Sequence, residues 1–70
     1  MAMKVYINTK EIVIFDGARI QDAILAYSTV EWKKVINGEI SIVDRFGNQT
    51  DPDGPIRDGQ QFTLKNNTEL

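Results

Sequence analysis

The sequence predicts one small domain of the α+β class, in which a helix covers one face of a β-sheet. Three observations support this prediction. Apolar and polar residues alternate near both ends of the chain, as they do in strands that have one buried face. Between these segments the apolar residues recur every three or four positions, which is typical of an amphipathic helix. Seventy residues also provide for only one hydrophobic core, because a second domain would need roughly 50 more.

Two strands are expected near the N-terminus, over residues 4–8 and 11–15. Their alternation places a set of branched aliphatic residues on one inner face. These residues are Val5, Ile7, Ile12 and Ile14. Only Thr9 and Lys10 separate the two strands, which is short enough for an antiparallel hairpin, although neither is the glycine that such a turn prefers.

A helix is expected after the Asp16-Gly17 turn, because the apolar period changes there from two to 3.6. The residues of its apolar stripe are Ile20, Ala23, Ile24 and Tyr27. The opposite side carries the polar Gln21 and Asp22, so we expect this helix to lie on the sheet with one side in water.

A short second helix is expected to follow. Ser28 and Glu31 have the spacing of a capping box, and Asn37-Gly38 would end the helix, since glycine accepts the left-handed conformation of a helix terminus. The residues expected on its buried side are Trp32, Val35 and Ile36. The alternative is a strand over Trp32–Ile36 with Asn37-Gly38 as a hairpin turn, which this dipeptide favours in isolation. The sequence leaves this choice between helix and strand open.

The rest of the chain predicts two further strands and little other regular structure. In the first, Ile40 and Ile42 lie on one side and Ser41 and Val43 on the other, and in the second Phe62 and Leu64 alternate with polar residues. Ile40, Ile42, Phe62 and Leu64 are expected to complete the inner face of the sheet. Between these two strands, residues 51–55 form a rigid turn segment in which two prolines fix φ and remove hydrogen-bond donors. The expected domain covers residues 1–65, and residues 66–70 are expected to be a flexible tail. We expect the two terminal strands to lie side by side and parallel.

The composition excludes several classes of function. The net charge is −2, whereas binding to a phosphate backbone needs a clustered basic face, so we expect no nucleic-acid partner. The chain has no Cys and no His, which removes thiolate chemistry and the commonest base and metal ligand at neutral pH. We therefore expect no enzyme activity, no catalytic residue, no metal and no cofactor. No apolar run approaches the roughly 20 residues that span a bilayer, so we expect no membrane partner and a soluble, cytoplasmic protein.

An acidic group in the second half of the chain has a structural interpretation. Its members are Asp44, Asp51, Asp53 and Asp58. Clustered carboxylates suggest a calcium loop, but these do not have EF-hand spacing, and aspartate is common in Pro and Gly turns for local reasons. Ser28 is similarly explained by capping, and Trp32 by packing beside Val35.

Two stretches of the sequence resemble a known group of proteins. IVIFDGARI at residues 12–20, followed by AIL at residues 23–25, is similar to the stretch that opens the helix in the sulfur-carrier proteins of thiamin and molybdopterin synthesis. IRDGQQFTL at residues 56–64 is similar to the segment that closes ubiquitin-like and carrier folds. The resemblance implies a β-grasp (ubiquitin-like) fold. This fold would have a mixed four- or five-stranded sheet, one main helix on one face and a short second helix.

The resemblance does not extend to the residues that carry the family's chemistry. Sulfur carriers act through a C-terminal Gly-Gly, whereas this chain ends in NNTEL at residues 66–70. The ferredoxin variants of the fold hold iron with Cys, which is absent here. The resemblance therefore leaves two functions. One is a non-catalytic protein-interaction module, and the alternative is a degenerate or precursor carrier linked to cofactor synthesis.

The expected interaction surface is the sheet face opposite the helix. The residues predicted to lie on it are Tyr6, Val13, Val43 and Thr63. This set is unusually apolar for a surface in water, and exposed apolar patches often mark interaction sites. The expected partner is another protein or a second copy of the chain. The alternative is burial of this face by the segment from Arg45 to Pro55, or by a homodimer.

Overall fold

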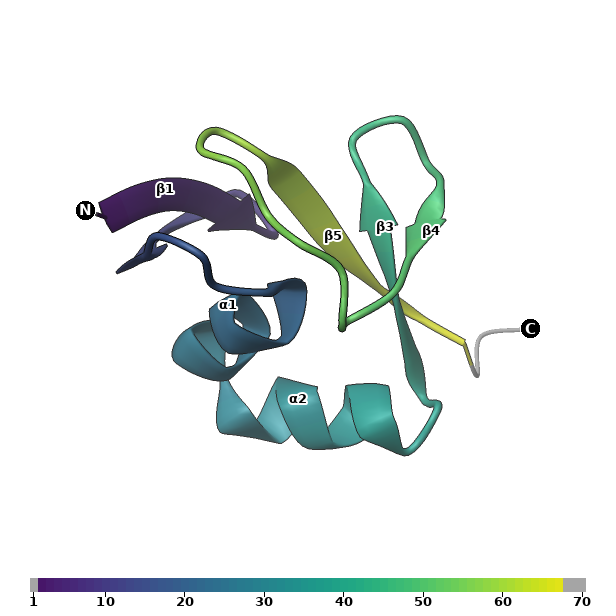
Figure 1. Cartoon of the computed structure of the whole chain (residues 1–70). Coiled ribbons are helices and arrows are strands. Elements are labelled where there is room, and N and C mark those ends of the chain that lie inside the picture. Colours follow the sequence, from purple (N-terminus) through teal and green to yellow (C-terminus); the bar gives the residue numbers. More distant parts are fainter. Residues whose placement is uncertain (1, 68–70) are drawn as a thin grey trace.

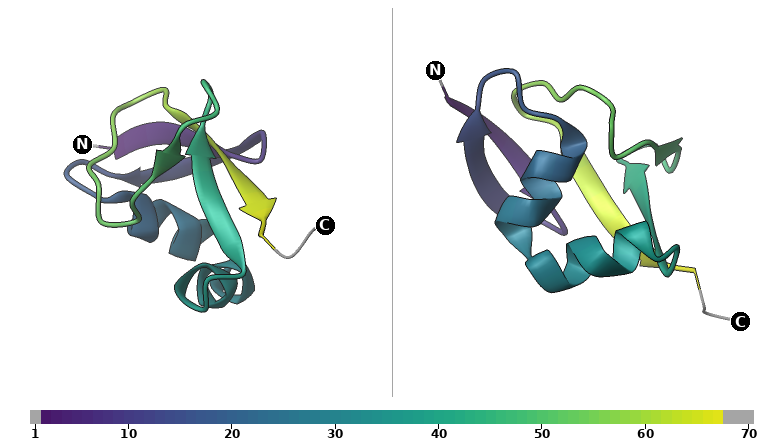
Figure 2. Two further views of the ribbon diagram at one scale, coloured as in Figure 1. Left: turned by 90° about the vertical axis from the view of Figure 1, so that its right-hand side faces the viewer. Right: turned by 60° about the horizontal axis from the view of Figure 1, so that its bottom comes forward.

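The computed structural model describes residues 2–67 of the chain. It consists of a five-stranded mixed sheet and two helices (Figure 1). In chain order the elements are β1 (Ala2–Ile7), β2 (Lys10–Phe15), α1 (Ile20–Tyr27), α2 (Thr29–Ile36), β3 (Ile40–Asp44), β4 (Gln49–Thr50) and β5 (Gln61–Asn66). The strand order in the sheet is β2-β1-β5-β3-β4. Both helices lie on one side of the sheet (Figure 2). The predicted α+β class is confirmed.

The N-terminal hairpin is antiparallel, as predicted, but its turn lies one residue earlier than expected. Ile7 pairs with Lys10, so the two turn residues are Asn8 and Thr9, and Lys10 belongs to β2. Both turn residues have positive φ, 50° for Asn8 and 71° for Thr9, as a two-residue turn of type I′ requires. Asparagine tolerates this conformation, which explains why the turn begins at residue 8.

The first helix is confirmed with its expected apolar stripe. Ile20, Ala23 and Ile24 are buried and Tyr27 is half-buried. The segment from Asp51 to Pro55 lies against the start of this helix.

That segment satisfies free backbone donors of the first helical turn. The N–H of Ile20 donates to the Gly54 carbonyl at 3.0 Å, and the N–H of Gln21 donates to the Pro52 carbonyl at 2.8 Å. These two bonds satisfy donors that a helix start otherwise leaves unpaired. The proline-rich turn segment therefore caps α1 rather than covering the sheet.

The second segment is a helix, not the alternative strand. The Ser28 hydroxyl accepts from the Glu31 N–H at 3.3 Å, and the chain leaves α2 through Gly38 at φ 80°. Trp32 and Val35 are half-buried against the core, but Ile36 is 62% exposed, so its expected burial is wrong. Ile36 lies about 100° around the helix from Val35, which places it beyond the side that faces the sheet.

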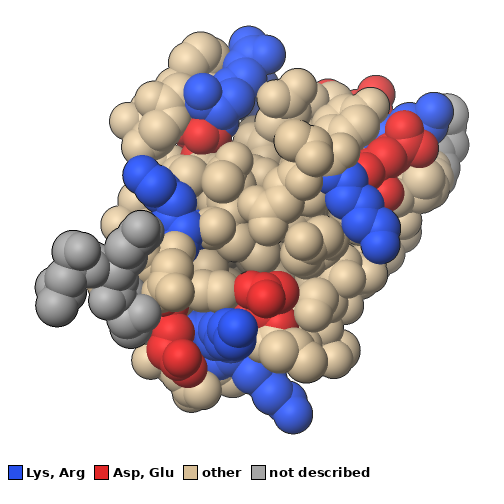
Figure 3. Space-filling view, turned by 180° about the vertical axis from the view of Figure 1, so that it is seen from behind, with Lys and Arg blue, Asp and Glu red and all other residues tan. Residues whose placement is uncertain are grey.

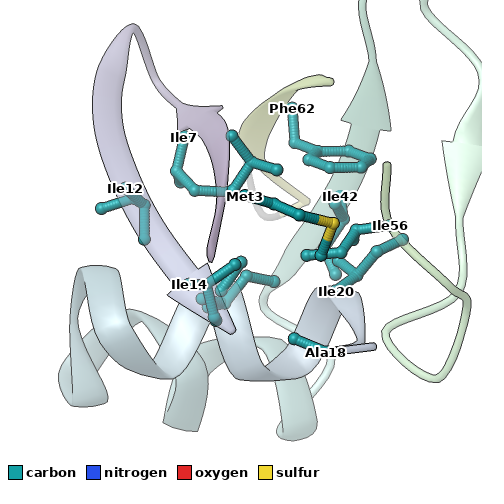
Figure 4. Packing of buried hydrophobic residues seen from close by; sticks show 12 residues of the cluster. Met3, Ile7, Ile12, Ile14, Ala18, Ile20, Ile42, Ile56 and Phe62 are labelled. Atoms are coloured by element: carbon teal, nitrogen blue, oxygen red, sulfur yellow. The ribbon is translucent and has the colours of Figure 1, made fainter. Parts of the chain in front are cut away.

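The core fills the space between α1 and the inner face of the sheet (Figure 4). The side chains of Val5, Ile7, Ala23 and Ile24 have no exposed surface. The other buried hydrophobic residues are Met3, Ile12, Ile14, Ala18, Ile20, Ile42, Ile56 and Phe62. All eight residues expected on the inner face of the sheet are thus buried or half-buried, the half-buried pair being Ile40 and Leu64.

The two terminal strands lie side by side and parallel, as predicted. We call their contact the β1–β5 seam. At its centre the N–H of Tyr6 donates to the Gln60 carbonyl at 2.9 Å, and the N–H of Asn8 donates to the Phe62 carbonyl at 3.0 Å. In the strand order, this seam is the one link between the β2-β1 hairpin and the β5-β3-β4 half of the sheet.

Two side chains extend the seam beyond its short ladder. At one end the Asp58 carboxylate accepts from the Lys4 N–H at 2.7 Å, and the Gly59 N–H donates to the Lys4 carbonyl at 2.6 Å. At the other end the Asn8 side-chain oxygen accepts from the Leu64 N–H at 2.9 Å. Asp58 and Asn8 thus take the place of backbone acceptors beyond the ends of the paired register.

The C-terminal strand runs to Asn66, one residue past its expected end. Asn67 is also tied down: its N–H donates to the Glu39 carbonyl at 2.7 Å, and its side chain accepts from the Ser41 hydroxyl at 2.7 Å. The first two residues of the expected flexible tail are therefore part of the folded structure. The remaining three, residues 68–70, lie outside the described residues.

The strained turn predicts a stabilising substitution. Thr9→Gly is expected to raise the free energy of unfolding by about 0.5–1 kcal/mol, because a β-branched residue at positive φ is strained and glycine is not. Urea denaturation measures this change. The same substitution at Thr63, which lies in the extended strand β5, should lower the free energy of unfolding. A destabilised Thr9→Gly variant would contradict this account of the turn.

The seam predicts a destabilising substitution. Asp58→Ala is expected to lower the free energy of unfolding by about 1 kcal/mol, because the Lys4 N–H loses a charged acceptor. Asp58→Asn retains an oxygen at that position and should lose less. Asp53→Ala is the control, since its ion pair with Arg19 is exposed and 3.6 Å long, so its loss should be under about 0.5 kcal/mol. Equal losses for Asp58→Ala and Asp53→Ala in urea denaturation would show that Asp58 does not anchor the seam.

Candidate functional site

The four residues predicted for the interaction surface come from four different strands. Tyr6 lies on β1, Val13 on β2, Val43 on β3 and Thr63 on β5. Next to each of these residues along its strand lies a buried residue that faces the helices. Because side chains alternate along a strand, all four residues lie on the opposite side of the sheet. We call this side the outer face. Their placement is as predicted, and their role in binding stays a prediction.

The outer-face residues do not form one continuous cluster. Val43 is directly opposite Thr63 in the β3–β5 pairing, so these two are neighbours. Tyr6 is opposite Gln61 on β5, and Val13 is opposite Lys4, out on β2 at the margin of the sheet. The sheet order therefore separates Val13 from Val43 by two strands.

A small hollow lies beside Tyr6. It has a volume of about 240 Å³, and its lining residues are Tyr6, Thr9, Gln61, Phe62 and Thr63. Tyr6 is half-buried and Thr63 is exposed, so the hollow has an aromatic ring and a hydroxyl-bearing side chain in its wall. An aromatic surface with a nearby polar group suits a protruding side chain of a partner protein.

The segment from Arg45 to Pro55 does not cover the outer face. Its strand β4 extends the sheet beyond β3, and its later part caps α1 on the helix side. Val13 remains 59% exposed. Burial of this face by that segment, the alternative considered from the sequence, is therefore wrong.

Two exposed aromatic residues were not part of the predicted surface. Phe15 is 60% exposed and follows Val13 by two positions on β2. Strand alternation is the sequence signal that assigns it to the same outer face as Val13. Phe46 is 73% exposed in the β3–β4 turn, where the Arg45 guanidinium lies 4.8 Å from the centre of its ring. No periodic pattern marked Phe46, because it lies outside a regular element.

A second hollow, of about 330 Å³, opens between two turns at one end of the sheet. Its lining residues are Asp44, Arg45, Phe46, Arg57, Asp58, Gly59, Gln60 and Gln61. The lining contains two arginines and two aspartates, so it has no excess of either charge. The Asp44 carboxylate is already engaged, since it accepts from the N–H groups of Phe46 at 2.9 Å and Asn48 at 3.0 Å.

The aspartates expected to have structural roles are dispersed. Asp44 orders the β3–β4 turn, Asp58 anchors the seam, and Asp53 pairs with Arg19. Within residues 2–67, no three His, Cys, Asp or Glu side chains gather into a group that could hold a metal ion. Neither helix of this part of the chain is long and apolar enough to cross a bilayer.

Charged side chains of both signs are interspersed over the molecule in the view from behind (Figure 3). Uncharged side chains cover most of that view. This side of the molecule therefore presents no large basic patch of the kind that follows a phosphate backbone.

Comparison of the sequence with known protein-family models and with curated proteins gives no match. The structure is a small α+β fold with a mixed sheet, which is compatible with the fold that the sulfur-carrier resemblance implies. The resemblance of residues 12–25 and 56–64 to the sulfur carriers stays a prediction. What the structure establishes is the placement of the predicted surface on an open sheet face.

Proposed function

We propose that this chain is a non-catalytic protein-interaction domain of the β-grasp type, which binds another protein through the outer face of its sheet. The observation that carries the proposal is that both helices cover one side of the sheet and leave apolar groups exposed on the other. Val13 and Phe15 there are 59% and 60% exposed. Exposed apolar groups are typical of surfaces that bind a partner, and the same face carries the hollow beside Tyr6.

The β-grasp part of the proposal is supported by the connection of the elements. The terminal strands are parallel neighbours, an antiparallel hairpin precedes the main helix, and β3 pairs with β5. The Asp58-Gly59 pair, which belongs to one of the two resembling stretches, holds Lys4 of β1 by two hydrogen bonds. The matching residues therefore have a definite structural role in this chain.

The non-catalytic part is supported by the roles of the remaining polar side chains. Both serines act structurally: Ser28 caps α2, and the Ser41 hydroxyl donates to Asn67. The sequence holds no His and no Cys to activate a nucleophile. In the described residues, no ionisable or hydroxyl side chain is buried, so none has the desolvated surroundings that catalytic groups usually require.

A photocrosslinking experiment tests the outer face as a binding site. A photoreactive amino acid replaces Thr63, beside the Tyr6 hollow, in the chain produced in its own cells. We expect a discrete crosslinked product with a second protein. Adding Tyr6→Lys should reduce this product at least tenfold, because a charge in the centre of the contact must be desolvated on binding.

The substitution is chosen so that the fold is retained. Position 6 lies opposite Glu11, so a lysine there gains an opposite charge across the strands. Ala26→Lys is the matched control, since it introduces the same side chain at an exposed position of α1. The proposal fails if Tyr6→Lys leaves the crosslinked product at its original level while circular dichroism shows an intact fold. It fails equally if a photoreactive residue at position 26 captures the same protein.

A further inference from the structure

Both margins of the sheet lack a neighbouring strand in the described residues, but they differ in length. The β4 margin is only two residues long, which offers little backbone for pairing. The β2 margin has six residues, and no strand of the described chain pairs with its outer side. Natural sheets blunt such edges with charges, prolines or bulges, but the centre of β2 carries Ile12, Val13 and Ile14 instead.

The pairing of β1 shows which backbone groups of β2 are free. The N–H groups of Tyr6 and Asn8 and the carbonyl of Lys4 form hydrogen bonds on the β5 side. The backbone groups of the even-numbered residues of β1 therefore point toward β5. The odd-numbered residues therefore face β2, where Val5 is opposite Ile12. Because backbone groups alternate in direction along a strand, the even-numbered residues of β2 are used in this pairing.

The backbone groups of three β2 residues thus point outward from the sheet. These residues are Glu11, Val13 and Phe15. Among the N–H and carbonyl groups of these three residues, only the Phe15 carbonyl has a hydrogen bond within the described part of the chain. It accepts from the Ala18 N–H at 3.2 Å. A carbonyl can accept a second hydrogen bond, so the whole outward row can pair with another strand.

The sequence of β2 is complementary to itself in one antiparallel register. If two copies meet with Val13 opposite Val13, then Glu11 of each copy exchanges backbone hydrogen bonds with Phe15 of the other. The same register places Ile12 opposite Ile14 on the inner face. It also places Lys10 of each copy opposite Asp16 of the other, once at each end of the pair.

The two charged residues lack an ion-pair partner within the described part of a single chain. Lys10 lies 6.0 Å from the centre of the Tyr27 ring but has no salt bridge, and Asp16 is exposed with none. Shifting the register to centre on Ile12 would place Lys10 opposite Ile14, and centring on Ile14 would place Asp16 opposite Ile12. Of these three registers, only the one centred on Val13 places the opposite charges Lys10 and Asp16 together, while Ile12 lies opposite Ile14 and Glu11 opposite Phe15.

We propose that the β2 edge binds a second copy of this chain, in an antiparallel β2–β2 pair centred on Val13. A two-fold axis at Val13 relates the copies, so each contact occurs twice and the interface closes on itself. The two sheets join into one continuous sheet, and the exposed Val13 and Phe15 side chains of both copies become neighbours on its outer face. This edge is distinct from the centre of the outer face, so the proposal stands whether or not the Tyr6 hollow binds another protein.

Sedimentation equilibrium of charge variants tests the pair. The natural chain is expected to sediment as a reversible dimer with twice the mass of one chain. Asp16→Lys should weaken dimerisation about tenfold, because it sets like charges opposite each other at both ends. Lys10→Asp should have the same effect. The double variant, in which Lys10→Asp and Asp16→Lys are combined, should restore the dimer to within about threefold of the original affinity.

Two further variants separate this edge from other surfaces. Val13→Pro removes an outward N–H without removing a bond to β1, so it should abolish the dimer while the monomer remains folded by circular dichroism. Tyr6→Lys, on the outer face, should leave the dimer unchanged. A chain that is monomeric at millimolar concentration overturns the proposal. A dimer that survives Val13→Pro, or that the double charge variant does not restore, overturns it as well.

Discussion

The β1–β5 seam is the contact on which the rest of this structure depends. It joins the first strand of the chain to the last, and in the strand order it alone connects the N-terminal hairpin with β3 and β4. Its paired ladder is short, with Tyr6 opposite Gln61 and Ile7 opposite Phe62. The Asp58 carboxylate and the Asn8 amide lengthen it at either end, over sequence separations of 54 and 56 residues. Two residue pairs alone would hold the β1–β5 register weakly, and these two side chains therefore help to fix it.

This register determines both faces of the sheet. Because Ile7 and Phe62 are opposite each other and buried, the alternate residues Tyr6 and Gln61 must face outward. A slip by one residue would exchange these faces and put the aliphatic residues of β1 in water. The seam also occupies the even-numbered backbone groups of β1. The odd-numbered groups are left for β2, and this determines which backbone groups of β2 point outward at the margin of the sheet. The composition of the outer face and the outward backbone groups of β2 are therefore consequences of one pairing.

Much of the fold could be predicted from the sequence, because alternation and helical spacing record which side of each element is buried. The inner-face residues, the stripe of α1 and the parallel terminal strands followed from these patterns. The exact hairpin turn did not, because the preference of Asn8 for positive φ competes with the strand pattern around it. Strand β4 was missed because two residues are too few to show a period. The burial of Ile36 was wrongly predicted because α2 packs against the core only through the side that carries Trp32 and Val35.

The candidate site was predictable in its location but not in its shape. Strand alternation placed Tyr6, Val13, Val43 and Thr63 on one side of the sheet. The order of the strands, which depends on long-range pairing, decides which of them are neighbours. The sequence could not show that Tyr6 and Thr63 share a hollow or that β2 lies at the margin. Phe46 was missed because an exposed aromatic residue in a turn leaves no periodic signal.

Amide hydrogen exchange in the native state tests the central role of the seam most directly. The N–H groups of Tyr6 and Asn8 donate across it, and the N–H of Asp44 donates to Asn48 in the β3–β4 turn. The seam protons are expected to exchange only through global unfolding, with an opening free energy equal to that from urea denaturation, while the Asp44 proton exchanges faster. Exchange of the seam protons through local opening, at a free energy as low as that of Asp44, would contradict this account.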